Sequence, residues 1–303
     1  MSVDFCGLRL AHSIINGSGT FDALAARRVF GEQLRAAFPF AAYVSKTITL
    51  QPRTGNPPPR LWESSAGLIN SIGLPNKGLE GYLREDLPEL HALLSSRGEE
   101  DPASAVPLIT NVMGASAEEL SRLVEACDAR HEIAAVELNV SCPNVRTGLD
   151  IGADPRQLEE VVAAVRARTG KPLIVKLTPN TAEVPACAQA AQDSGADAVS
   201  LINTLRAGAV SPARGSAPRR AWLGGGTGGL SGPAIRAVAL AQVESVAARV
   251  SIPVVGMGGV QSAAHARELL EVGATLVAVG TESFRDPAAA ARIVLGLQET
   301  AVG

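Results

Sequence analysis

A cysteine at position 142 lies between two asparagines in the stretch Asn-Val-Ser-Cys-Pro-Asn-Val-Arg-Thr-Gly, residues 139–148. Such a cysteine can be a buried small hydrophobe, half of a disulfide, a metal ligand or a catalytic group. The chain has four cysteines and four histidines, without a Cys-x-x-Cys pair or a His-Glu-x-x-His motif. This spacing argues against a zinc or iron–sulfur site. A disulfide framework is also not expected in a cytosolic chain of 303 residues.

Two glycine-rich segments in the last fifth of the chain suit a phosphate group. Gly258 and Gly259 follow one apolar run, Gly280 follows the next, and Gly232 precedes both. Glycine lets backbone N–H groups approach a phosphate without a Cβ in the way. In a barrel of alternating strands and helices, phosphate is commonly held after the seventh and eighth strands. Each segment by itself is also compatible with an ordinary tight turn.

Lysine is rare in this sequence, and half of the lysines follow apolar runs. The four are Lys46, Lys77, Lys171 and Lys176, and the first and last of these stand at such run ends. Lysine supplies a compact positive charge on a flexible stem. We expect Lys46 and Lys176 to lie in a binding site, although a lysine can also extend along an apolar surface toward water.

These residues need elements that bring them together, and eight short apolar runs supply them. The runs are apolar on both faces, as buried parallel strands are. Gly, Asn, Lys, Ser or Thr residues lie at or just beyond the end of each run. Between the runs lie segments of helical pattern with N-terminal caps, such as Ser116 with Glu119 and Asp154 with Pro155. The runs are residues 13–16, 42–46, 106–112, 134–140, 172–177, 197–203, 252–257 and 275–280.

This alternation predicts an α/β fold, a (β/α)8 TIM barrel formed by residues 1–303 as a single domain. The active site of such a barrel lies at the C-terminal ends of the strands. Two connections, about 47–105 and 205–231, are too long for plain loops, and we expect them over this mouth.

Composition excludes several other classes of protein. The chain is 46% hydrophobic and 19% charged, with a net charge of −3. This balance gives no electrostatic reason to expect a nucleic acid or an anionic membrane as partner. The N-terminal residues lack the pattern of a secretory signal, and charged residues interrupt the longest apolar stretch. We therefore expect a cytoplasmic protein.

Taken together, the motifs resemble class 1 dihydroorotate dehydrogenases. The most specific matches are Gly-Asn-Pro-Pro-Pro-Arg (55–60), Asn-Ser-Ile-Gly-Leu-Pro-Asn (70–76) and Asn-Val-Ser-Cys-Pro-Asn (139–144). Further matches follow in the family's order from residue 17 to residue 284. The resemblance implies a TIM barrel that binds FMN and oxidises dihydroorotate to orotate in pyrimidine biosynthesis.

The resemblance also implies roles for individual residues. In the family a proton leaves C5 of dihydroorotate to a cysteine, which matches Cys142, and a hydride leaves C6 to N5 of FMN. A thiol, with an ordinary pKa of about 8.5, suits this task when its surroundings lower that value. The positions that match FMN contacts are Ser18, Ser45, Lys46, Asn111, Asn139, Lys176, Ile202, Gly232, Gly258, Gly259, Gly280 and Thr281. Those that match substrate contacts are Lys46, Asn70, Ser71, Ile72, Gly73, Leu74, Asn139, Asn144, Asn203 and Thr204.

The sequence says less about which molecule finally accepts the electrons taken from the substrate. The motifs are closer to the class 1B catalytic subunit, which forms homodimers and pairs with a second chain that carries FAD and a 2Fe–2S cluster and uses NAD. Alternatives are a class 1A homodimer that reduces fumarate, a dihydropyrimidine-type flavin enzyme, and a barrel lyase or isomerase that binds a sugar phosphate. Residues 206–229 depart from the family pattern, and residues 142–152 are predicted to form a lid over the substrate.

Overall fold

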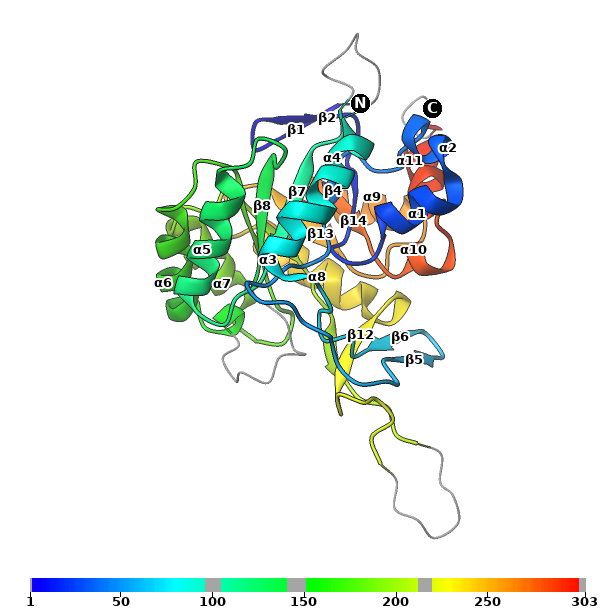
Figure 1. Cartoon of the computed structure of the whole chain (residues 1–303). Helices are drawn as coiled ribbons and strands as arrows, with labels where there is room; N and C mark the ends of the chain where they lie inside the picture. The colour runs from blue at the N-terminus through cyan, green and yellow to red at the C-terminus, as the bar shows by residue number, and fades with distance from the viewer. Residues whose placement is uncertain (1, 96–104, 141–150, 212–219, 300–303) are drawn as a thin grey trace.

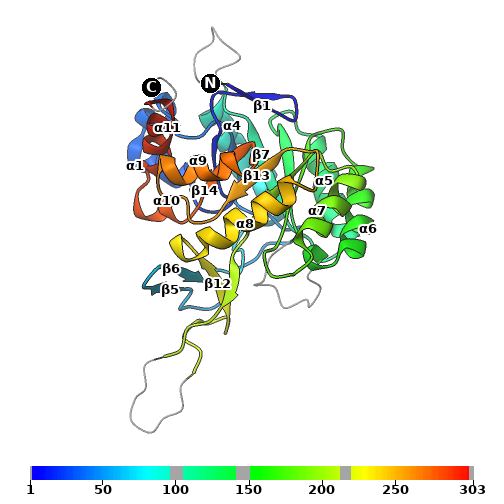
Figure 2. The same ribbon diagram turned by 180° about the vertical axis from the view of Figure 1, so that it is seen from behind.

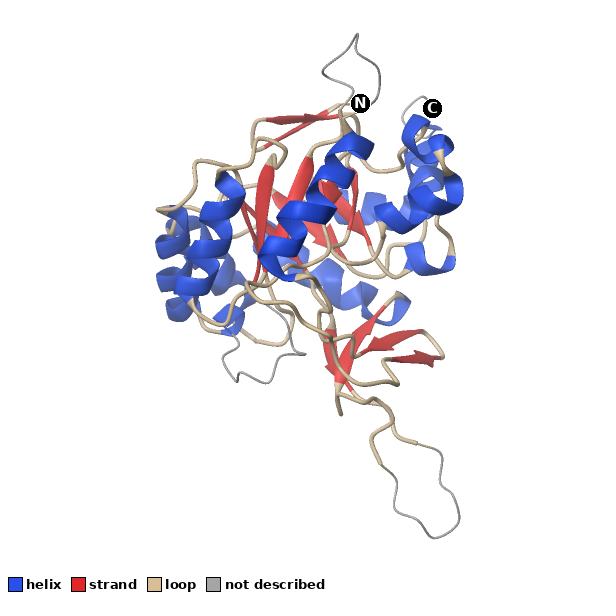
Figure 3. Ribbon diagram, in the orientation of Figure 1, coloured by secondary structure: helices blue, strands red, loops and turns tan. Residues whose placement is uncertain are grey.

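A computed structural model describes residues 2–95, 105–140, 151–211 and 220–299. Its central feature is an eight-stranded parallel sheet rolled into a barrel, with the helices outside it (Figures 1 and 3). All eight predicted strands are present, and the predicted TIM barrel is confirmed. In spatial order the strands are β3 (Ile14–Asn16), β14 (Leu276–Val279), β13 (Val254–Met257), β10 (Ala198–Leu201), β9 (Leu173–Lys176), β8 (Ala135–Asn139), β7 (Leu108–Val112) and β4 (Tyr43–Val44).

The two ends of this sheet, β3 and β4, are joined through one side chain. The Asn16 amide donates a hydrogen bond to the carbonyl oxygen of Val44 and accepts one from its N–H, both at 2.8 Å. One backbone bond, from Ala41 N–H to Ile14 O at 2.9 Å, supports the same junction. Asn16 is fully buried, so water cannot pair with the backbone groups at this junction. The Asn16 side-chain amide takes the place of the backbone hydrogen bonds that would otherwise join the two strands.

The helices pack around the barrel on opposite flanks. Figure 2 shows α5, α6 and α7 on one flank, and α1, α9, α10 and α11 on the other. The predicted caps are confirmed: Ser116 Oγ accepts the N–H of Glu119, and Asp154 accepts N–H bonds at the start of α6. The helices are α1 (Ala23–Phe30), α2 (Glu32–Ala36), α3 (Gly78–Gly81), α4 (Leu87–Leu94), α5 (Ala117–Asp128), α6 (Pro155–Arg166), α7 (Val184–Asp193), α8 (Arg236–Ala247), α9 (Ala263–Glu271), α10 (Glu282–Arg285) and α11 (Ala289–Glu299).

Strand side chains alternate between two apolar cores. One core lies inside the barrel and includes Ile15, Ile174 and Val255, while the larger core lies between the strands and the helices. A hairpin of β1 (Val3–Phe5) and β2 (Leu8–Leu10) covers the N-terminal end of the barrel, and its Phe5 and Leu10 belong to the inner core (Figure 1). The opposite, C-terminal end is the one where a barrel of this kind carries its active site.

The two long connections meet over that opposite end, as predicted. They build a second, antiparallel sheet in the order β11 (Leu205–Ala207), β12 (Gly228–Ser231), β6 (Gly67–Asn70) and β5 (Leu61–Ser64). Figure 3 shows this sheet projecting from the barrel. The edge-to-face ring pair of Trp62 and Trp222 also joins the two connections. The atypical segment 206–229 thus contributes to this sheet, although residues 212–219 lie outside the described part.

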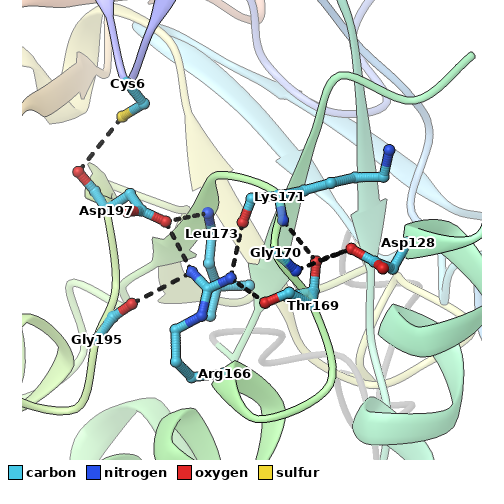
Figure 4. Close-up of polar contacts among 9 residues, drawn as sticks. All are labelled: Cys6, Asp128, Arg166, Thr169, Gly170, Lys171, Leu173, Gly195 and Asp197. Carbon is cyan, nitrogen blue, oxygen red and sulfur yellow. Dashed lines mark hydrogen bonds and ion pairs between the residues drawn. The ribbon is translucent and has the colours of Figure 1, made fainter. Parts of the chain in front are cut away.

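The N-terminal end of the barrel carries a polar network (Figure 4). The guanidinium of Arg166, at the end of α6, donates to the Asp197 carboxylate at 2.8 Å and to the carbonyl oxygens of Thr169 and Lys171. The same Asp197 oxygen accepts the N–H of Leu173 at 2.8 Å. The network therefore ties one helix to the starts of β9 and β10, on the face where a barrel keeps its stabilising interactions.

A nearby ion pair leads to a pH-dependent prediction. Arg130 donates to both carboxylate oxygens of Glu132, which lowers the pKa of Glu132 from its ordinary 4.5 to about 2. A carboxylate with a lowered pKa stabilises the fold above its unfolded-state value and loses that contribution as the pH falls through its folded-state value. Glu132→Gln should therefore reduce the free energy of unfolding by about 1 kcal/mol at pH 7.

This deficit should shrink between pH 4.5 and about 2, where wild type also becomes protonated. Urea unfolding of both proteins across that range measures it. A deficit that stays constant with pH would instead indicate a packing defect.

No helix in the described part of the chain is long and apolar enough to cross a membrane.

Candidate functional site

The polar strand ends predicted from the sequence are neighbours in the barrel. Asn139 on β8 and Ser200 on β10 are both register partners of Lys176 on β9. All three side chains are buried. The site is therefore built on rigid strands, and its central group is a lysine.

Lys176 is only 5% exposed, which is unusual for a charged side chain. Among the described residues, no hydrogen bond or ion pair engages its ammonium group. A buried charge without a partner is costly. The arrangement suits a ligand that brings a negative or electron-rich group to this lysine, as the sequence predicts.

A chain of hydroxyl and amide groups runs beside Lys176. Ser18 Oγ donates to the carbonyl oxygen of Ser45 at 2.8 Å and lies 3.3 Å from Thr47 Oγ1. Asn139 Nδ2 donates to the same Thr47 oxygen at 3.4 Å. Two predicted cofactor residues, Ser18 after β3 and Asn139 at the end of β8, thus converge on Thr47, which sequence analysis did not select. Lys46 lies between two buried neighbours but is itself exposed, so its ammonium group is accessible to a ligand.

Glu137 is a second buried charge that sequence analysis missed. It is 3% exposed and accepts hydrogen bonds from Asn111 Nδ2 at 2.5 Å and Ser200 Oγ at 2.7 Å. The signal was present, because Glu137 is the only carboxylate in the run 134–140. That run is apolar on both faces, so periodicity did not indicate whether Glu137 points into the barrel.

The glycines predicted to hold phosphate come together after β13 and β14. Gly232, Gly258 and Gly259 all have positive φ angles, of 89°, 137° and 70°. A Cβ on Gly259 would lie 3.0 Å from the carbonyl oxygen of Gly232 and 2.7 Å from the Cβ of Arg236. A Cβ on Gly232 would lie 3.6 Å from Cγ2 of Thr281, which directly follows Gly280. The segments that contain the four glycines therefore lie close together.

Ile202 connects these glycines to the rest of the site. It is 3% exposed, and a Cβ on Gly258 would lie 3.3 Å from its Cγ1. An apolar side chain between the glycines and the polar strand ends suits the flat rings of a flavin whose phosphate lies at the glycines.

The predicted substrate residues 70–74 lie where the second sheet meets the barrel. Asn70 Nδ2 donates to the carbonyl oxygen of Gly229 at 3.3 Å, and Ser71 Oγ donates to that of Thr227 at 2.8 Å. These two side chains therefore help to hold β12 against β6. The turn that follows, Ile72 to Leu74, contains two successive positive φ angles, 75° at Gly73 and 55° at Leu74. A positive φ at leucine is uncommon and occurs most often where a functional site requires it.

The other predicted substrate residues form a second cluster after β10. Asn203 Oδ1 accepts the N–H of Thr204 at 2.8 Å. Thr204 in turn packs against Gly229, where a Cβ would overlap its hydroxyl. Residues 203–204 and 70–74 thus approach β12 from its two sides.

The predicted catalytic residue Cys142 and the predicted substrate contact Asn144 lie outside the described residues, as does most of the predicted lid, 142–152. The other three cysteines lie in the described part of the chain, away from the predicted site. Cys127 and Cys187 are fully buried in the outer core. Burial raises the pKa of Cys127 to about 12, and burial together with Asp197 raises that of Cys6 to about 12. Neither of these two thiols can serve as a base near neutral pH.

Comparison with known proteins decides between the chemistries that this geometry permits. A sequence model described as dihydroorotate dehydrogenase matches residues 1–300. The chain belongs to the dihydroorotate dehydrogenase family. Two similar curated relatives of this family are each named dihydroorotate dehydrogenase B (NAD(+)), catalytic subunit.

The relative from Trichlorobacter lovleyi is 42% identical over 303 residues, covering 99% of this chain and 92% of the relative. That from Geotalea uraniireducens is 41% identical over 299 residues, covering 98% and 92%. The solved structure of dihydroorotate dehydrogenase from Eimeria tenella in complex with ferulenol superposes with a TM-score of 0.78. It covers 99% of this chain and 84% of that one at 20% identity, so it supports the fold alone.

Dihydroorotate dehydrogenases are flavin enzymes, and the residues of this family member fit a flavin nucleotide. The chain passes too closely at Gly258 and Gly259 for a Cβ, which leaves the backbone N–H groups of this turn uncovered, and Lys176 is a buried cation without a described partner. Asn111 Oδ1 is also buried and has no hydrogen-bond partner among the described residues. The glycines suit a phosphate, Lys176 suits an electron-rich ring edge, and Asn111 Oδ1 suits an N–H donor. FMN carries all three groups.

Gly259→Ala tests the glycine site of this dihydroorotate dehydrogenase. The new Cβ would contact Arg236 and Gly232, and a φ of 70° is strained for alanine. We expect FMN affinity to fall by at least about tenfold, measured by flavin fluorescence during titration of the flavin-free protein. Gly208→Ala is a matched control, because no atom lies within 4 Å of its Cβ position. Equal affinities in both variants would place the phosphate elsewhere.

Proposed function

We propose that this chain oxidises dihydroorotate to orotate, with FMN bound at the C-terminal mouth of the barrel. The observation that carries the proposal is the buried Lys176, which lies between Asn139 and the phosphate-type glycines and has no partner in the described part of the chain. The chain also matches the family from residue 1 to residue 300. A pyrimidine ring presents alternating N–H and C=O groups, and amide side chains read such an edge because they both donate and accept.

In the proposed reaction the C5–H and C6–H bonds break and a C5=C6 double bond forms. The Cys142 thiolate takes the proton from C5. Bound FMN supplies the acceptor for the hydride from C6. Lys176 offsets the negative charge that arrives with the hydride, while Asn139, Asn144, Asn203 and residues 70–74 hold the ring and its carboxylate.

We further propose that the chain works in the cytoplasm as a class 1B catalytic subunit. It would form a homodimer and pass electrons to NAD through a partner chain that carries FAD and a 2Fe–2S cluster. The names of the two relatives support this assignment, because each includes NAD(+) and the words catalytic subunit. Among the described residues, no cluster of His, Cys, Asp and Glu could hold a metal ion.

Anaerobic mixing of the FMN-loaded chain with dihydroorotate tests the reaction. We expect bleaching of the flavin absorbance and stoichiometric orotate. Dihydrouracil, which lacks the carboxylate, should not bleach the flavin; bleaching by dihydrouracil alone would favour a dihydropyrimidine-type enzyme. Fast turnover with fumarate by the chain alone would overturn the NAD assignment, and failure to take up FMN would overturn the reaction.

A further inference from the structure

Glu137 has no role in the reaction as proposed, yet it is a carboxylate buried inside the barrel. Burying a carboxylate is costly unless donors compensate it. Two donors do so: Ser200 Oγ bonds to Oε1 at 2.7 Å, and Asn111 Nδ2 bonds to Oε2 at 2.5 Å. Each carboxylate oxygen thus has its own neutral donor, one from β10 and one from β7.

This arrangement fixes which way the Asn111 amide points. Glu137 Oε2 accepts a hydrogen bond from Nδ2, so the carboxylate holds the nitrogen end of the amide. The oxygen end, Oδ1, must then point away from Glu137. It is buried and has no partner among the described residues, although buried polar atoms are nearly always paired. The backbone N–H of Asn111 donates to Ser45 Oγ at 3.0 Å, which holds this part of the strand in place.

We propose that Glu137 is a positioning residue that presents Asn111 Oδ1 to an imide N–H of a bound ring. The inference rests on the proposed function, because an imide N–H occurs both in flavin, at N3, and in dihydroorotate. Without Glu137, the amide of Asn111 can turn and offer its nitrogen to the ligand, where two donors would face each other. The preference for a ring with an N–H at this position therefore depends on a residue that does not touch the ring.

The test compares FMN with 3-methyl-FMN, which has no N3–H, in wild type, Glu137→Gln and Glu137→Met. We expect wild type to bind FMN more tightly than 3-methyl-FMN. The ratio of the FMN affinity to the 3-methyl-FMN affinity should fall roughly tenfold in Glu137→Met. Glu137→Gln should lie between them, because glutamine satisfies either orientation of Asn111. Ser200→Ala serves for comparison: it removes the other donor to Glu137 but leaves Asn111 paired, so it should lower the ratio less than Glu137→Met does.

A spectroscopic measurement separates positioning from a general structural defect. The N3–H proton of 15N-labelled FMN should resonate downfield in wild type and shift upfield in Glu137→Met, at concentrations where both proteins are saturated. A uniform loss of affinity for both flavins, with an unchanged N3–H resonance, would show that Asn111 does not contact the flavin N3–H.

The source of the N–H is identified by a second pair of ligands. The ratio of FMN to 3-methyl-FMN affinity can be the same in all variants while Glu137→Met lowers the preference for dihydroorotate over its N-methyl derivatives, measured as a ratio of KM values. In that case Asn111 contacts the N–H of the substrate. If neither ratio changes, the positioning role is wrong even when dihydroorotate still reduces the flavin. If wild type is not reduced by dihydroorotate at all, it is the proposed function that fails.

Discussion

Replacing Cys142 with alanine should slow reduction of the bound flavin by dihydroorotate by about 10²- to 10⁴-fold, the usual contribution of a positioned general base. FMN affinity should stay at its wild-type level, because Cys142 is not among the residues proposed to hold FMN. Anaerobic stopped-flow absorbance at saturating dihydroorotate measures the rate. Cys142→Ser should also be slow near neutral pH, and its rate should rise with pH, since a hydroxyl is a much weaker acid than a thiol.

Cys6→Ala is a matched control for this experiment. Cys6 lies at the closed end of the barrel, where its thiol donates to the carbonyl oxygen of Asp197 (Figure 4). This variant should reduce its flavin at the wild-type rate. A wild-type rate in Cys142→Ala as well would refute the assignment of the base.

Replacing Lys176 with methionine should have the second large effect. Methionine fills similar space without the charge, so the negative charge that arrives with the hydride is no longer offset. Removing one preorganised electrostatic group of this kind costs on the order of 10²- to 10³-fold in rate. The flavin midpoint potential should also fall, because the reduced, anionic form loses its counter-charge. Stopped-flow reduction and a dye-coupled redox titration measure the two effects.

Lys77→Met is the control for this variant. Lys77 is exposed and pairs with Glu85 and Asp86 at the molecular surface. Loss of this surface pair should change neither the rate nor the potential. If Lys176→Met kept both wild-type values, the lysine would face away from the flavin.

The barrel could be read from the sequence because its strands leave strong local signals. Runs such as 172–177 are apolar on both faces, and the helices between them begin at capping residues such as Ser116 and Asp154. The ends of these strands also indicated Lys176, Asn139 and the glycines. Since parallel strands in a barrel all end on one face, knowing the ends was enough to predict that these residues meet.

Contacts between distant parts of the chain could not be read in this way. Asn16 was expected only as the end of a strand, but its amide completes the barrel by bonding Val44, 28 residues away. The second sheet is similar, because nothing local in residues 61–70 indicates that they pair with 228–231. The helix α4 was also missed, since it lies within a connection that was expected to be a long loop.

The second sheet also sets an order in which the molecule can be completed. Ser71 bonds Thr227 across 156 residues of sequence, and Asn70 bonds Gly229 across 159. Contacts over such separations form late, because the intervening chain must first be ordered. On the ribosome, β6 emerges long before β12 exists, and β7 to β10 are made between them. The proposed substrate residues 70–74 therefore reach their final positions only after most of the barrel has been synthesised, so a partly made chain has no complete pocket for the substrate.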